Sequence, residues 1–183
     1  MDFLILNLIL FFLCIFLLLI LSMVWPPDSP WAPWWRTGRW IAIAICRLGG
    51  VSKKDVVYDL GSGDGTALLI AAKEFGARGV GIEIDPLRAT ISKARIRAAK
   101  LKNNIKVLQN NFFNVPINDA TVIFVYLVPR ALLRLKPKFL KELKPGTRIV
   151  SYRYEIPYLP LKKKDEVHQL FLYTIPTAGK KKD

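Results

Sequence analysis

The hydrophobic pattern divides this chain of 183 residues into one unbroken apolar run and a longer part in which short apolar runs and amphipathic segments alternate. The unbroken run, residues 3–24, carries no charged side chain. As a helix it would be about 33 Å long, which is enough to cross the hydrocarbon core of a bilayer. The pattern therefore predicts a transmembrane anchor at residues 1–25.

A cleaved signal peptide is the competing interpretation of this run. A signal peptide needs a basic start, a shorter apolar core and a cleavage site made of small residues. The chain instead starts with Met1 and Asp2, and the run ends in the sequence MVWPP. We therefore favour an uncleaved anchor.

Residues 26–50 form a separate segment that begins rich in tryptophan and proline. All five tryptophans of the chain lie between Trp25 and Trp40, and the prolines in the same window disfavour a helix. Tryptophan concentrates at the membrane–water boundary, so we interpret Trp25 and Trp31 as a juxtamembrane belt. The apolar positions from Arg39 to Leu48 predict a short helix that ends at two glycines.

Strands and helices are predicted to alternate from residue 51 to residue 178. Short runs of β-branched and aromatic residues indicate buried parallel strands, and segments with helical periodicity separate them. The predicted strands are Val56–Leu60, Gly79–Ile84, Ile105–Leu108, Ala120–Leu127 and Thr147–Tyr152, with an antiparallel edge strand at Gln169–Ile175. The predicted helices are Thr66–Phe75, a helix that starts at Asp85-Pro86, and Arg130–Leu143, broken by Pro137. This order is typical of an α/β domain with a Rossmann-like sheet flanked by helices.

The helix after Asp85 is expected to be amphipathic. Its predicted buried stripe consists of Leu87, Ile91, Ala94, Ala98 and Leu101. Its predicted outer side consists of Arg88, Lys93, Arg95, Arg97, Lys100 and Lys102. Residues 179–183 at the end of the chain form a basic tail.

All basic residues lie beyond the anchor. No Lys or Arg precedes Arg36, and the part after the anchor carries 28 basic and 13 acidic residues, because Asp2 is the one acid before it. By the positive-inside rule the N-terminus faces outward and the large C-terminal part faces the cytoplasm. An uncleaved anchor in a mitochondrial membrane is the alternative. The charge alone would also favour nucleic acid, but the anchor argues against that partner, so none is expected.

The cysteines and the single histidine indicate no metal site and no disulfide. Cys14 lies in the anchor and Cys46 in the short helix, and their spacing is not that of metal ligands. His168 lies beside the last predicted strand, where a solvated or strand-edge histidine is expected.

The stretch from Val56 to Pro86 carries the candidate chemistry. A strand leads into the loop Gly61-Ser62-Gly63-Asp64-Gly65, a helix follows, and a second strand ends at Glu83. Glycines let the backbone turn tightly and approach a ligand, and the N–H groups at the start of the helix favour a polar or anionic group. A carboxylate at the end of the second strand accepts hydrogen bonds from the ribose hydroxyls of a nucleoside.

The glycine spacing separates this loop from the dinucleotide fingerprint G-x-G-x-x-G, because the third glycine is Gly65 and position 66 is Thr. With Asp59 before the loop and Asp64 inside it, the stretch resembles motif I of the class I S-adenosylmethionine-dependent methyltransferases. An NAD-type fold or a merely structural turn is the alternative.

A wider resemblance covers residues 33 to 175. The segments VVYDLGSGDG, GVGIEIDP, NNFFNVPINDATVIFVYLVP, KELKPGTRIVSYRYEIP and LFLYTIP resemble the small protein-lysine methyltransferase family that includes the mitochondrial enzymes acting on the adenine nucleotide translocase and on the ATP synthase c subunit. Those enzymes also carry an N-terminal hydrophobic segment and modify lysines of membrane proteins.

The resemblance implies that S-adenosylmethionine is the cofactor. The residues implied to bind it are Asp59, Gly61, Ser62, Gly63, Asp64, Gly65, Glu83, Ile84, Asn111 and Phe112. An acid is usual at the position of Asn111, whose amide oxygen can accept the same hydrogen bond from adenine. Residues 33–37 are a candidate lid over the cofactor.

The methyl acceptor is expected at the end of the fourth strand. Many amino-methylating enzymes carry a D/N-P-P-Y/F motif there, whereas this chain has Tyr126-Leu127-Val128-Pro129. Tyr126 and Pro129 are the candidate catalytic residues. Tyr126 can hydrogen-bond an amine, and its alternative role is that of a core aromatic.

These features together predict a membrane-anchored enzyme that methylates lysines of a membrane protein. A methyltransferase of a lipid, a quinone or another small hydrophobic acceptor is the first alternative. A membrane-tethered binding module without activity is the second.

Overall fold

The computed structural model describes residues 3–24 and 36–176 of the chain. The chain forms two compact units, residues 1–35 and residues 36–183. The predicted belt at Trp25 and Trp31, residues 33–35 of the predicted lid and the basic tail lie outside the described residues.

The first unit contains α1 (Phe3–Val24), which is one uninterrupted helix, as predicted. Its side chains from residue 3 to residue 21 are exposed, and Asn7 donates its amide hydrogen to the Phe3 carbonyl oxygen over 2.8 Å. Among the described residues it is the one helix long and apolar enough to cross a membrane, a property that signal sequences share. The helix is confirmed, and its insertion into a membrane stays a prediction.

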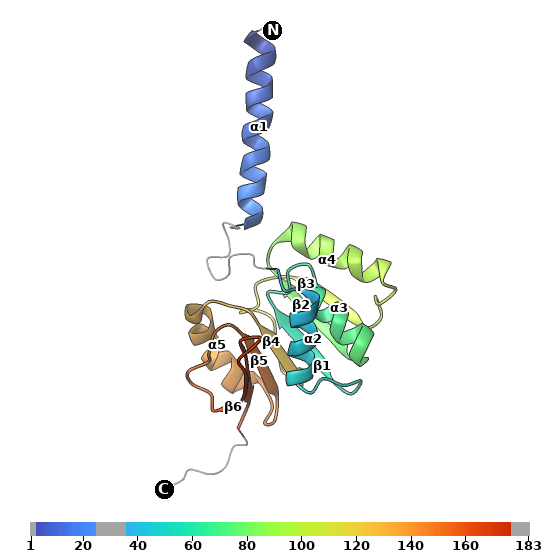
Figure 1. Cartoon of the computed structure of the whole chain (residues 1–183), viewed down its shortest axis with the longest axis vertical. Helices are drawn as coiled ribbons and strands as arrows, with labels where there is room; N and C mark the ends of the chain where they lie inside the picture. Colours follow the sequence, from blue (N-terminus) through green and yellow to red (C-terminus); the bar gives the residue numbers. More distant parts are fainter. Residues whose placement is uncertain (1–2, 25–35, 177–183) are drawn as a thin grey trace. The chain divides into compact units, whose positions relative to one another are not determined.

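The second unit is a mixed seven-stranded sheet flanked by helices (Figure 1). The strand order is β3-β2-β1-β4-β5-β7-β6. The strands are β1 (Val56–Leu60), β2 (Arg78–Glu83), β3 (Ile105–Gln109), β4 (Val122–Val125), β5 (Arg148–Tyr152), β6 (Leu161–Asp165) and β7 (Leu170–Thr174). The helices are α2 (Arg39–Leu48), α3 (Thr66–Phe75), α4 (Pro86–Ala98) and α5 (Pro129–Glu142).

Strands β1 to β5 are parallel, and their carboxyl ends meet at one edge of the sheet. The register places Leu60 of β1 beside Ile82 of β2 and Val125 of β4. The chain winds from β1 outward to β3 and then returns to β4 on the other side of β1. In open α/β sheets such a reversal leaves a crevice outside the carboxyl ends, which is where ligands bind.

Helices cover both faces of this sheet. Buried residues of α2, α3 and α4 form one hydrophobic cluster with residues from β1, β3, β4, β5 and β7. The crossover from β4 to β5 runs in the opposite direction to that from β1 to β2, so a right-handed connection places α5 on the other face. Helices α2, α3 and α4 thus share one hydrophobic core with the sheet.

The side of the sheet formed by the last two strands of the chain differs from the prediction. Strand β7 is antiparallel, as predicted, but it is not the edge strand, because β6 pairs along its outer side. The sequence of β6 is LKKKD, and its side chains are almost entirely exposed, so no hydrophobic alternation marked it as a strand. Lysines on an edge strand discourage pairing with other chains.

Strand β4 and helix α5 also depart from the prediction. The strand ends at Val125, so Tyr126 lies just beyond it rather than inside it. The helix is continuous through Pro137 instead of broken there. A proline inside a helix removes one backbone hydrogen bond, which here is the bond to the carbonyl of Leu133. Leu133 lies on the exposed side of α5, so water can donate to that carbonyl instead.

The buried face of α4 was predicted wrongly. Its buried residues are Arg88, Ala89, Ser92 and Ile96. Leu87 and Ile91 of the predicted stripe are instead 47% and 36% exposed. The cause lies in the glycine loop, because Ser92 packs so closely on Gly65 that a Cβ there would lie 2.3 Å from the Ser92 hydroxyl oxygen.

Candidate functional site

The glycine loop joins β1 to α3 at the carboxyl edge of the sheet. Gly61, Gly63 and Gly65 have φ values of 85°, 53° and 77°, a region that residues with a side chain adopt rarely. The backbone N–H groups of Gly61 and Ser62 donate to the Ile82 carbonyl oxygen over 2.9 and 3.1 Å. These bonds fix the start of the loop to the end of β2.

Glu83 supports the middle of the same loop. Its Oε2 accepts a hydrogen bond from the Gly63 N–H over 2.7 Å, and its Oε1 accepts one from the Asp85 N–H over 3.0 Å. The side chain is buried, at 5% exposure. A carboxylate offers about four acceptor positions, so each oxygen keeps a position for a ligand hydroxyl.

Asp64 is the most highly connected residue of the loop. Its Oδ2 forms ion pairs with Arg36 over 3.0 Å and with Arg95 over 2.7 Å. Its Oδ1 accepts hydrogen bonds from the backbone N–H and the hydroxyl of Thr66 over 3.1 and 2.7 Å. The Arg36 contact brings a residue of the predicted lid onto the glycine loop.

Asp59 lies buried in β1, next to the loop. Burial, followed by the nearby charges of Glu83 and Asp64, raises the pKa of Asp59 to about 7. The described residues donate no hydrogen bond to its carboxyl group. Three carboxyl groups therefore share one small region, and a positively charged ligand would relieve their mutual repulsion.

The end of β3 carries two asparagines and two phenylalanines. The Asn111 side-chain oxygen accepts a hydrogen bond from the Phe113 N–H over 3.0 Å, and the Asn110 side-chain oxygen accepts one from the Asn111 N–H over 2.7 Å. Phe112 is buried, and Phe113 packs against it with ring centres 4.6 Å apart. Both asparagines thus have a structural role, and the predicted contact of Asn111 with adenine stays a prediction.

The ends of β4 and β5 carry aromatic side chains. The rings of Tyr126 and Tyr152 lie 4.5 Å apart, and burial raises the pKa of Tyr126, which is therefore a neutral phenol at neutral pH. Tyr126 is half-buried at the edge of the sheet, which argues against its alternative role as a core aromatic. A Cβ at Gly61 would lie 3.6 Å from Leu127 Cδ2, an ordinary van der Waals distance, so this end of the sheet lies beside the glycine loop.

The predicted site residues therefore gather along one edge. The loop and Glu83 are linked by hydrogen bonds, Ile84 follows Glu83 directly, and Pro129 is the first residue of α5. The described residues provide no partner for the buried hydroxyl of Ser62. Sequence reasoning overlooked Tyr152 and Arg153, although their place at the end of a predicted parallel strand was a usable signal.

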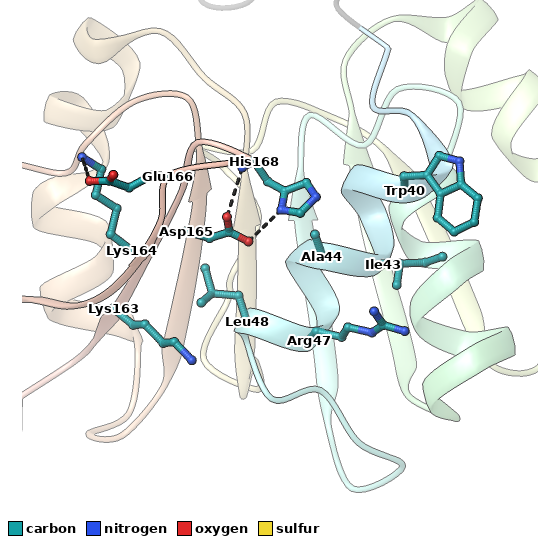
Figure 2. A pocket seen from close by; sticks show the side chains of 10 residues that line it. All are labelled: Trp40, Ile43, Ala44, Arg47, Leu48, Lys163, Lys164, Asp165, Glu166 and His168. Carbon is teal, nitrogen blue, oxygen red and sulfur yellow. Dashed lines mark hydrogen bonds and ion pairs between the residues drawn. The ribbon is translucent and has the colours of Figure 1, made fainter.

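A separate hollow of about 570 Å³ lies between α2 and the β6–β7 hairpin (Figure 2). Figure 2 shows Trp40, Ala44 and Leu48 of α2 on one side and Lys163 on the other. His168 lies at this hollow, where its Nδ1 is 2.8 Å from Asp165 Oδ2. None of the residues predicted to bind the cofactor lines it, so it is distinct from the candidate site.

The sequence of this chain is similar to a known protein family and to several curated proteins. A family model described as the ANTKMT methyltransferase domain matches residues 59–163. A protein-lysine N-methyltransferase of Saccharolobus islandicus is 37% identical over 160 residues, which cover 84% of this chain and 98% of the relative. The Homo sapiens lysine N-methyltransferase of the ATP synthase c subunit is 27% identical over 113 residues, 62% of this chain and 46% of the relative. The chain thus spans nearly all of the first relative and less than half of the second.

A solved structure is similar as well. The RNA methyltransferase from Salinibacter ruber, in complex with S-adenosyl-L-homocysteine, is 32% identical with a TM-score of 0.77. The match covers 81% of this chain and 98% of that chain.

Proposed function

The chain belongs to the ANTKMT methyltransferase domain family, and from this premise we propose that it methylates lysine side chains of a protein held in a membrane. It is an S-adenosylmethionine-dependent methyltransferase, a conclusion that rests on the family match, the protein-lysine N-methyltransferase relative and the solved homologue with bound S-adenosylhomocysteine. The protein-lysine substrate class follows the curated relatives, and the membrane target is the finer part of the proposal.

The residues present fit this cofactor. The glycine loop offers backbone close to the ligand, and Glu83 keeps acceptor positions that two ribose hydroxyls can use. Asp59, whose pKa is raised to about 7, can give up its proton beside a cofactor that carries a positive sulfur and an ammonium group. Asp64, paired with Arg36 and Arg95, keeps the loop in place. When bound, S-adenosylmethionine supplies the methyl group on that positive sulfur. The residues proposed to hold it are therefore those of the loop, Asp59 and Glu83.

The acceptor end fits an amine that must be neutral when it reacts. A lysine amine has a pKa of about 10.4 in water, and desolvation lowers that pKa. The segment from Tyr126 to Pro129 contains no carboxylate that would hold the amine as an ammonium ion. The Tyr126 hydroxyl can hydrogen-bond the amine and orient its lone pair, and orientation can supply much of the rate of a transfer reaction. The amine loses its proton to water before it reacts.

The membrane target is supported by the first unit. Helix α1 is long and apolar enough to cross a bilayer, and its polar Asn7 hydrogen-bonds within the helix. Tethering the domain to the bilayer would present a membrane protein at a high effective concentration. The basic residues after the anchor would add about 1 kcal/mol each where they lie near an anionic leaflet facing the cytoplasm.

RNA is a second candidate substrate, because the similar Salinibacter ruber structure is an RNA methyltransferase and the net charge is +14. Soluble RNA, however, gives no role to an apolar helix whose side chains are exposed from residue 3 to residue 21. We therefore rank it below a membrane protein.

Deleting residues 1–25 tests the tether. The second unit starts at residue 36 and has its own core, so the truncated protein should fold and bind S-adenosylmethionine with unchanged affinity. Calorimetry measures that affinity, and transfer of radioactive methyl groups to target-containing membranes measures the activity. We expect methylation in membranes to fall at least roughly tenfold because the effective concentration is lost. Equal rates for the two proteins would reject tethering as the function of α1.

A further inference from the structure

An unusual backbone corner follows β5 at the acceptor end. Arg153 and Gln169 have positive φ values of 68° and 54°, which residues with a side chain adopt rarely. The two are joined, because the Arg153 N–H donates to the Gln169 carbonyl oxygen over 2.8 Å. The Ser151 hydroxyl donates to the Tyr154 carbonyl oxygen over 2.5 Å and closes the same turn. Backbone outliers that the surrounding structure enforces often mark functional sites.

This corner directs the Arg153 side chain back over two tyrosines. Its guanidinium carbon lies 5.5 Å from the ring centre of Tyr152 and 5.8 Å from that of Tyr126. Both distances are within the range of about 6 Å in which a cation is attracted to an aromatic face. A hydrogen bond with Tyr152 is the largest of several contacts that raise the pKa of Arg153. The ring pair therefore already binds a cation, supplied by the chain itself.

The ring pair lies where the methyl acceptor is expected. Tyr126 and Tyr152 lie at the ends of the adjacent parallel strands β4 and β5, and Val125 pairs with Ser151 in the register. Leu127, next to Tyr126, packs on Gly61 of the cofactor loop. Both tyrosines are partly buried. Tyr152 packs against the hydrophobic cluster, and the rest of the ring pair stays accessible to a ligand at this edge.

We propose that Tyr126 and Tyr152 form a binding site for the cationic ammonium head of the acceptor, and that Arg153 occupies this site until the acceptor displaces it. Arg153 is then a specificity-determining residue. The site would bind mono- and dimethyllysine ammonium more tightly than unmethylated lysine, because each methyl group weakens the hydration of the cation that the aromatic faces attract. The proposal rests on the proposed lysine substrate, and it adds that lysines already carrying methyl groups are retained for further transfer.

Binding of a small cation to the full chain tests this proposal without any methyl transfer. The probe is choline, and its matched control is 3,3-dimethylbutanol, which has the same shape but no charge. Saturation-transfer NMR is recorded in a maltoside detergent with S-adenosylhomocysteine bound, so that no sulfonium competes for the site. We expect choline to bind more tightly than the neutral probe, and the Arg153→Ala variant to bind choline about fivefold more tightly than the wild type.

Further variants separate the site from a general structural effect. Tyr152→Phe keeps the aromatic face and should keep choline binding, whereas Tyr152→Leu should lose it. Lys136→Ala removes a comparable cation–ring contact, 5.6 Å from the ring centre of Tyr158, and should change nothing. Equal binding of the two probes, or no gain in Arg153→Ala, would overturn the proposal even if lysines of membranes are methylated. Selective choline binding without lysine methylation would keep the cation site and reject lysine as the acceptor.

Discussion

The two halves of the ligand-binding edge are built from opposite kinds of side chain. The half around the glycine loop gathers Asp59, Asp64 and Glu83, and the last two accept hydrogen bonds from backbone N–H groups. The half after β4 and β5 presents Tyr126 and Tyr152 with the cation of Arg153 over them. The carboxylates concentrate in the half around the glycine loop, whereas the half after β4 and β5 carries the tyrosine pair and the arginine.

The difference fits what each half is proposed to bind. A cofactor with a positive sulfur is stabilised by nearby carboxylates, which the loop holds in place before binding. An amine acceptor would be held in its unreactive ammonium form by the same carboxylates. Aromatic faces attract a cation far less strongly than a buried carboxylate does, so they can hold the amine without preventing its deprotonation.

The largest effect is expected at Glu83. Glu83→Ala removes the acceptor for two backbone N–H groups and for the ribose hydroxyls. Each buried polar group left without a partner costs about 1–3 kcal/mol, so cofactor affinity should fall roughly 100-fold or more. Calorimetry with S-adenosylhomocysteine measures the loss.

Two further variants make the Glu83 result specific. Glu83→Gln keeps the size of the side chain but only one acceptor oxygen, so it should bind the cofactor with intermediate affinity. Glu74→Ala removes an exposed ion pair with Arg39, 2.7 Å long, and should leave affinity unchanged. Full affinity in both Glu83 variants would show that the acidic half does not bind the cofactor.

A smaller effect, which depends on pH, is expected at Asp59. The pKa of Asp59 is raised to about 7 in the folded protein, so its carboxyl group is mostly protonated at pH 6. The positive cofactor favours the carboxylate, and binding must release this proton. Affinity for S-adenosylmethionine should therefore rise between pH 6 and pH 8, by up to about tenfold. Asp59→Asn should abolish this rise.

The stability of the free protein should change in the opposite direction. A carboxyl group whose pKa is higher in the folded state than in the unfolded chain stabilises the fold fully below the unfolded value of about 3.9. That contribution is lost as the pH rises through about 7. Thermal unfolding from pH 5 to pH 8 should show this loss in the wild type and less of it in Asp59→Asn. An unchanged slope in the variant would assign the pH dependence to other groups.

The acidic half could be predicted from the sequence because its pattern is local. The strand, the glycine loop and the helix from Val56 to Phe75 have the predicted bounds, and the loop contacts the predicted Glu83. These elements follow one another in the chain, so the spacing of residues reports their proximity. The predicted binding roles of the individual residues remain predictions.

The aromatic half could not be derived in the same way. Tyr126 and Tyr152 meet only because β4 and β5 are adjacent, and Arg153 covers them only because its backbone has a positive φ. Strand β6 is polar, and the buried face of α4 includes Arg88 and Ser92 because the helix packs on the glycine loop. Such features depend on tertiary contacts that hydrophobic periodicity does not record.

The most direct test of the proposed function is to identify the molecule that receives the transferred methyl group. Membranes are incubated with the full chain and methyl-tritiated S-adenosylmethionine, with Glu83→Ala as the control, and then separated into protein, organic-solvent and RNA fractions. We expect label in the protein fraction, recovered as methylated lysine after hydrolysis, and little label with the control. Label in the organic-solvent fraction or in RNA, or equal label with Glu83→Ala, would contradict the proposed function.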